Sequence, residues 1–109
     1  MTKTYKTIAE IIAEGGATLN AEGRAVNYAT GYQVSRRDVL IIAAARLSWA
    51  HIKPLLTKGA FVGVWIDDGV AFVDMSERVA TKAEALKLGR ERNQISVWNW
   101  SKKTCVYCQ

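Results

Sequence analysis

The sequence is poor in the residues that build metal sites and covalent cross-links. Its 109 residues include two cysteines, one histidine and one proline. A structural zinc site needs four cysteine or histidine ligands, and a single copy of this chain supplies fewer than four. The P-loop and EF-hand patterns are absent as well. We therefore expect no metal and no other cofactor.

Long apolar runs are missing too. The longest, Val39 to Ala45, is far shorter than the roughly 20 residues that cross a bilayer. Residues 1–6 contain no apolar signal core. These absences predict a cytoplasmic protein without membrane contact, in which both cysteines stay reduced.

Length and composition predict a single domain over residues 1–109. Half of the residues are hydrophobic and 23% are charged, which is typical of a globular chain. Fifteen lysines and arginines face 10 acidic residues, for a net charge of +5. This excess favours an acidic partner, either a nucleic acid or an acidic protein face.

The first half of the chain carries weak secondary-structure signals. Apolar spacing predicts a helix over 4–14, and short strands are expected over 17–19 and 31–34. A long helix is predicted over 36–53, because the apolar residues there recur at helical spacing. Ser35 precedes it as an expected N-cap.

The second half is patterned more clearly. Two β-rich runs, 61–66 and 70–75, flank Asp67-Asp68-Gly69, a strong hairpin signal. A Thr-x-x-Glu capping box opens a predicted helix over 81–92. A strand is expected over 94–100, with tryptophans on one of its faces.

These elements predict the α+β fold class. The hairpin 61–75 and the strand 94–100 belong to a small antiparallel or mixed sheet packed with three helices. Trp65 lies in the most apolar strand, so we expect it in the core. Residues 101–109 follow the last predicted strand and are a candidate flexible tail.

Residue types used in catalysis are present but scattered. The CxxC at 105–108 ends the chain, whereas a thioredoxin-like site needs this motif at a helix start after a strand. His51 follows Ser48 by three residues without a nucleophile elbow. Nothing in the sequence places His51 beside Asp67 or Asp74. We therefore predict that the chain is not an enzyme.

Tryptophans next to basic residues are the most informative surface signal. Two of the four tryptophans share a face of the last predicted strand, between basic residues on either side. Such an edge can stack single-stranded bases or anchor a protein partner, unless a helix covers both rings. The predicted partner-binding residues are Arg90, Arg92, Trp98, Trp100, Lys102 and Lys103.

Short motifs along most of the chain carry a resemblance to known proteins. They are Gly15–Asn20, Thr30–Ser35, Gly63–Gly69 with Val73–Asp74, Glu84–Leu86, Gly89–Ile95 and Val97–Trp98. In these segments the sequence resembles a family of small, mostly uncharacterised proteins encoded in accessory regions of actinobacterial phages and prophages. Residues 101–109 differ from the usual ending. The resemblance supplies no catalytic residues and implies a gene product that acts in a bacterial cytoplasm.

Two functions are compatible with these features. The first is a non-catalytic phage-type accessory protein that binds and modulates or inhibits a host or defence protein, of the anti-CRISPR or anti-restriction type. The alternative is a nucleic-acid-binding module with a basic, tryptophan-containing face, whose affinity would fall steeply with salt. The partner of the first could be a nucleic-acid-handling complex, and a homodimer also stays open.

Overall fold

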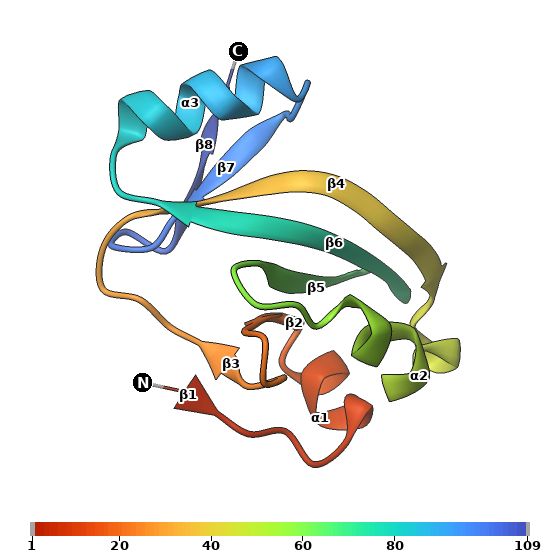
Figure 1. The fold of residues 1–109 in the computed structure, drawn as a ribbon. Coiled ribbons are helices and arrows are strands. Elements are labelled where there is room, and N and C mark those ends of the chain that lie inside the picture. Colours follow the sequence, from red (N-terminus) through yellow and green to blue (C-terminus); the bar gives the residue numbers. More distant parts are fainter. Residues whose placement is uncertain (1, 109) are drawn as a thin grey trace.

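One sheet makes up most of the molecule (Figure 1). The computed structural model describes residues 2–108. In this part of the chain the strands are β1 Thr2–Lys3, β2 Gly16–Leu19, β3 Ala25–Val26, β4 Tyr32–Ala43, β5 Phe61–Asp67, β6 Val70–Val79, β7 Ser96–Asn99 and β8 Thr104–Tyr107.

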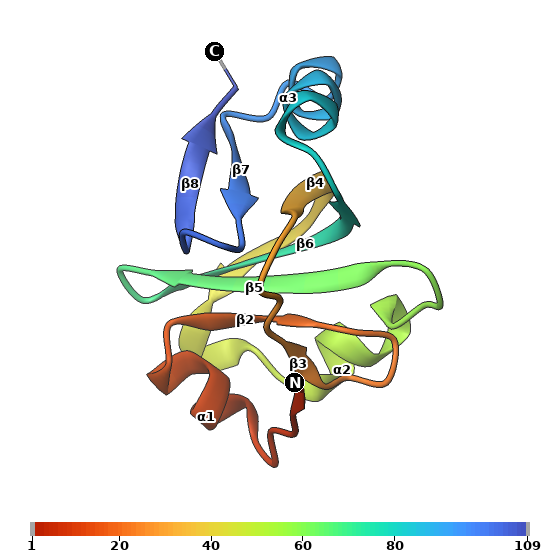
Figure 2. The ribbon, with the colours of Figure 1, turned by 90° about the vertical axis from the view of Figure 1, so that its left-hand side faces the viewer.

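The strands form a continuous antiparallel sheet in the order β1-β3-β2-β5-β6-β4-β7-β8. The sheet curls into a half-barrel, so that β7 and β8 run steeply relative to β2 and β5 (Figure 2). The helical elements are short: α1 Ile8–Ala13, α2 Trp49–Ile52, α3 Lys82–Glu91 and two 3-10 helices, Ala44–Arg46 and Lys53–Leu55.

This architecture corrects the predicted fold class. A small sheet packed with three helices is wrong, because the sheet dominates the structure and no described helix exceeds the 10 residues of α3. The sheet is large because one of its strands, β4, is long. This strand spans 12 residues and pairs with β6 along its length. No helix within residues 2–108 is long and apolar enough to cross a membrane.

The predicted helix over 36–53 is wrong for a specific reason. Most of its first half belongs to β4, whose pairing with β6 shifts register between Ser35 and Arg37 and again between Asp38 and Leu40. A β-bulge inserts an extra residue and breaks the alternation of side chains that marks a strand. The apolar run after Asp38 therefore mimics helical spacing. Ser35 lies inside the strand and caps no helix.

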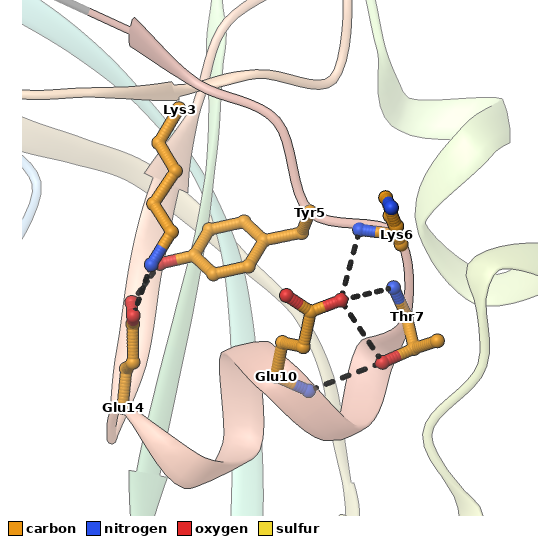
Figure 3. A network of polar contacts seen from close by, with 6 residues as sticks. All are labelled: Lys3, Tyr5, Lys6, Thr7, Glu10 and Glu14. Carbon is orange, nitrogen blue, oxygen red and sulfur yellow. Dashed lines mark hydrogen bonds and ion pairs between the residues drawn. The ribbon is translucent and has the colours of Figure 1, made fainter.

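Other elements follow their local signals. The β5–β6 hairpin forms, and Asp68 and Gly69 at its turn have φ values of 49° and 75°. Helix α3 begins after Thr81, whose Oγ1 accepts a hydrogen bond from the Glu84 N–H at 3.2 Å. Helix α1 is shorter than predicted. It begins after Thr7, which forms a capping box with Glu10 (Figure 3).

All three helices pack on the same face of the sheet. Under α1 and α2 this face buries Leu19, Val62, Val64, Ala71 and Val73. Under α3 it buries a second cluster. The opposite face of the sheet is left without a helix among the described residues, and this face carries the candidate site. The members of the second cluster are Val34, Val79, Ala85, Val97 and Cys108.

The segment expected as a candidate flexible tail contains a strand. Residues 104–107 form β8, which pairs with β7, and the Cys108 side chain is fully buried beneath α3. Gly89 of α3 makes this burial possible, because a Cβ there would lie 2.5 Å from Cys108 Sγ and 3.1 Å from Val97 Cγ1. Residue 109 lies outside the described residues.

We expect Gly89→Ala to destabilise the protein by about 1–3 kcal/mol, although alanine favours an exposed helix by up to about 1 kcal/mol. Its Cβ would displace the Cys108 thiol. Cys108→Ala removes that thiol, so the double variant should lose less stability than the sum of the two single variants. Urea unfolding of the four proteins measures this coupling. Additive losses would show that α3 does not rest on Cys108.

Candidate functional site

A broad open groove of about 1090 Å³ lies on the face without helices. Strands β4, β5 and β6 form its floor. Its walls come from residues of β1, β2 and β3 on one side and of β7 and β8 on the other. Figure 2 shows how these strands are arranged. The curl of the sheet brings these two walls toward each other, so segments from both ends of the chain meet at one site.

Strand periodicity determines which side chains reach the groove. On β6 the alternate residues Phe72, Asp74 and Ser76 face it. On β4 the bulge lets both Ser35 and Asp38 face it, because the register shift advances the pairing by one residue. The floor of the groove is consequently polar at its centre.

Asp74 is the half-buried acidic group of this floor. Its carboxyl lies over Gly63 of β5, where a Cβ would come within 2.2 Å of Asp74 Oδ1. Burial raises the pKa of Asp74 to about 6, with a further rise from the Asp38 charge; the Ser35 hydroxyl and the Gly63 N–H oppose it. Asp38 and Asp74 are direct cross-strand partners, an arrangement that is unfavourable for like charges.

Ser35 adds a hydrogen-bonding group that lies near the Asp74 carboxyl but is incompletely satisfied. Its Oγ is buried and makes no hydrogen bond of normal geometry within the described residues. Buried hydroxyls normally have a partner, since leaving one unpaired costs roughly 1–3 kcal/mol. The polar centre is therefore incompletely satisfied by the protein itself.

A buried hydrogen-bond chain joins the floor to the β7 wall. Trp100 Nε1 donates to Gln33 Oε1 at 3.1 Å, and Gln33 Nε2 donates to Ser76 Oγ at 2.9 Å. Trp98 packs edge-on against Trp100 with ring centroids 6.2 Å apart. These hydrogen bonds hold the β7 wall against the floor of the groove.

Exposed apolar side chains extend from the groove across three strands. Trp65, Phe72 and Ile41 are successive cross-strand neighbours on β5, β6 and β4, and are 57%, 39% and 64% exposed. The prediction that Trp65 lies in the core is wrong, because no described element covers this face. We call these three residues the apolar row; Trp65 and Phe72 also line the groove.

The β1 end of the groove holds a satisfied polar network (Figure 3). The Glu14 carboxylate accepts hydrogen bonds from Lys3 Nζ and from the Tyr5 hydroxyl. These bonds hold the pKa of Glu14 below its usual value. Burial, together with Glu14, raises the pKa of Tyr5 to about 12. This end of the groove therefore carries no unbalanced charge.

The groove as a whole is acidic, although the chain is basic. Its charged lining consists of Lys3, Glu14, Asp38, Asp67 and Asp74. Lys3 and Glu14 pair with each other, whereas the three aspartates form no ion pair within residues 2–108. The net charge of +5 predicts an acidic partner. The charge of the groove lining is negative, so the groove itself does not favour one.

The six predicted partner-binding residues lie in three places. Trp98 and Trp100 line the groove, and Trp100 is only 6% exposed. No helix covers both rings in the described chain. Arg90 of α3 and Arg92, the residue that follows this helix, lie on the other face of the sheet, where Arg90 Nε donates to the Cys108 carbonyl at 2.6 Å. Arg92 Nη2 contacts the Glu77 carboxylate at 2.5 Å, so neither arginine joins the tryptophans.

Lys102 and Lys103 occupy the turn between β7 and β8. Lys103 Nζ lies 4.8 Å from the centroid of the Trp100 ring and donates to the Tyr28 carbonyl at 2.9 Å. Lys102 is exposed. The structure thus brings Lys103 together with Trp100 but does not gather the six residues into one surface.

Two other residues considered in the sequence, His51 and Cys105, do not belong to the polar centre of the groove floor. His51 Nδ1 accepts a hydrogen bond from the Ser48 N–H at 3.1 Å at the start of α2. Cys105 is an exposed free thiol at the groove wall. Within residues 2–108, no three His, Cys, Asp or Glu side chains gather in a way that could hold a metal ion.

Sequence reasoning missed most of the groove floor. Phe72 and Asp74 share one parity on the strand predicted over 70–75, so their common face could have been recognised, whereas Ser76 lies in the part of β6 beyond the predicted bounds. Ser35 and Asp38 could not, because the bulge that aligns them is invisible in the local pattern. The missed residues are Gln33, Ser35, Asp38, Phe72 and Ser76, whereas Asp74 had been considered without its place in the groove.

Comparisons with protein families, with curated proteins and with solved structures find no match to this chain. The resemblance to phage accessory proteins therefore stays a prediction. Function must be argued from the geometry of the groove.

Proposed function

We propose that this chain is a non-catalytic binding protein that takes up a segment of another protein in its groove. The apolar row is the observation that carries the proposal. Three large side chains, Ile41, Trp65 and Phe72, stay exposed side by side on the sheet face that bears no helix in the described part of the chain. Contiguous exposed apolar patches of this kind mark interaction sites, and tryptophan is a frequent anchor in protein interfaces.

The shape of the groove favours a polymer over a small molecule. Small-molecule sites usually enclose about 70–90% of their ligand. This groove is open and continues into the apolar row on the sheet surface. An extended segment could cross the floor and reach Trp65 and Phe72 at the same time.

A protein partner also fits better than a nucleic acid. The three unpaired aspartates of the groove would repel phosphates, and Arg90 and Arg92 are occupied within the molecule. A host or defence protein, as implied by the phage resemblance, is our predicted class of partner.

Selection from a library of displayed random peptides tests the proposal. We expect peptides to be enriched on the protein and to bind Trp65→Ala roughly tenfold or more weakly. Tyr107→Ala is the matched control, because Tyr107 is also an exposed aromatic, 71% accessible, but lies outside the groove lining. That variant should bind within about twofold of the original protein.

Two results would contradict the proposal. One is a selection that enriches no peptide above background. The other is a set of peptides that Trp65→Ala binds as tightly as the original protein does. Circular dichroism of both variants verifies that they are folded; both substitutions are at exposed positions.

A further inference from the structure

The charge of the groove indicates which kind of segment it would accept. Asp38, Asp67 and Asp74 face the groove without an ion-pair partner in the described chain, although the protein carries a surplus of five positive charges. Lys3, the only cation in the lining among residues 2–108, is bound to Glu14. An occupant that brings positive charge would therefore meet no competing cation at the aspartates.

The centre of the floor combines two energetically unfavourable features. Asp38 and Asp74 oppose each other across β4 and β6, and Gly63 leaves space for the Asp74 carboxyl. Ser35 Oγ, beside them in the lining, is buried and lies near the Asp74 carboxyl without a hydrogen bond of normal geometry in residues 2–108. A cation between the carboxylates would relieve their repulsion and supply the missing counter-charge.

Aromatic rings continue the site along the same face. Phe72 lies two positions before Asp74 on β6, which corresponds to roughly 7 Å along a strand. Trp65 lies directly opposite Phe72. Lysine and arginine side chains combine an apolar stem of about this length with a charged head. Aromatic faces also attract the head itself.

We infer that the segment taken up by the groove carries a lysine or arginine whose charged head lies between the Asp38 and Asp74 carboxylates and whose stem packs against Trp65 and Phe72. The inference rests on the proposed function and names the chemistry of the partner. It requires no change in the fold, because the carboxylates and the rings already share one face.

Sequencing of the selected peptides and substitution of the aspartates test this inference separately from the proposed function. We expect lysine or arginine in the enriched peptides. Replacing that residue by norleucine, which keeps the stem and removes the charge, should weaken binding roughly tenfold or more. Asp38→Asn and Asp74→Asn should each weaken binding of the basic peptide to a similar degree, measured by calorimetry or by shifts of the tryptophan indole NMR signals.

Asp68→Asn is the matched control. It removes the same charge from the hairpin turn, outside the groove lining, and asparagine tolerates the positive φ found there. Binding by this variant should change by no more than about twofold. The difference between this variant and the two groove variants isolates the local effect from that of net charge.

The outcomes are distinguishable. Enriched peptides without basic residues, or equal binding of the norleucine peptide, would overturn the inference and leave the proposed function standing. Binding of free n-butylammonium or methylguanidinium as tight as that of the peptide would assign the groove to small cations instead. Dimers abolished by Asp74→Asn would assign it to a second copy. Absence of any peptide binding would overturn both proposals.

Discussion

Replacing Asp74 by asparagine is expected to stabilise the folded protein at about pH 8 by roughly 2–3 kcal/mol. In the folded state burial raises the pKa of this carboxyl from 3.8 to about 6. Each pH unit between these two values costs the folded, ionised form about 1.4 kcal/mol. Asparagine keeps the shape of the side chain and an oxygen for the Gly63 N–H, but it has no charge to bury.

The stability that Asp74 contributes to the fold decreases as the pH rises. The folded state holds the Asp74 proton more tightly than the unfolded chain does, because its pKa is the higher one. The contribution of this group to stability is therefore most favourable below about pH 4 and is lost as the pH rises toward about 6. Above that pH the full cost of ionisation remains.

Urea unfolding between about pH 4 and pH 8 provides the measurement. The gain in stability of Asp74→Asn over the original protein should be near zero at the acid end and largest at the alkaline end. Asp68→Asn, which removes a charge from an exposed turn, should show no such trend. A gain that is independent of pH, or a loss at about pH 8, would contradict a half-buried, ionised Asp74.

Stability and binding should consequently move in opposite directions in this variant. A substitution that merely damages the fold lowers both. If Asp74→Asn is more stable and yet binds basic peptides more weakly, the carboxylate is retained for its interaction with a partner. Residues that destabilise the fold at a binding site commonly have this explanation.

Local sequence signals were sufficient to predict the elements that form within a short stretch of the chain. The β5–β6 hairpin was predicted from Asp68-Gly69, and α3 from the Thr81 cap, because each signal lies within a few residues of the structure that it determines. The β4 strand was not predictable in the same way. Its partner β6 follows about thirty residues later in the chain, and its bulges disturb the alternation that identifies a strand.

The candidate site depends on the same long-range pairing. Trp98 and Trp100 were recognised as informative, and they line the groove. Their predicted basic neighbours on α3 face the other side, since a sheet separates them. The carboxylate pair of Asp38 and Asp74 arises from strand register alone, which no local pattern in the sequence specifies.

The largest loss of stability is expected at the edge of the groove, for Gly16→Ala. Gly16 has a φ of +133°, and a Cβ there would lie 2.1 Å from the Val64 carbonyl oxygen and 3.1 Å from the Trp65 Cα. Both neighbours are backbone atoms of β5, so no side chain can rotate out of the way. We expect a loss of at least about 3 kcal/mol in the free energy of unfolding, measured by urea denaturation.

Gly15→Ala separates the two causes of this loss. Gly15 also has a positive φ, +85°, but a Cβ there would meet nothing within 4 Å. That variant should lose only the backbone cost, about 1–2 kcal/mol. The difference between the two variants measures how closely β2 approaches β5 beside Trp65. Equal losses would mean that β2 can withdraw from β5, and then the groove wall would not be fixed where Trp65 begins the apolar row.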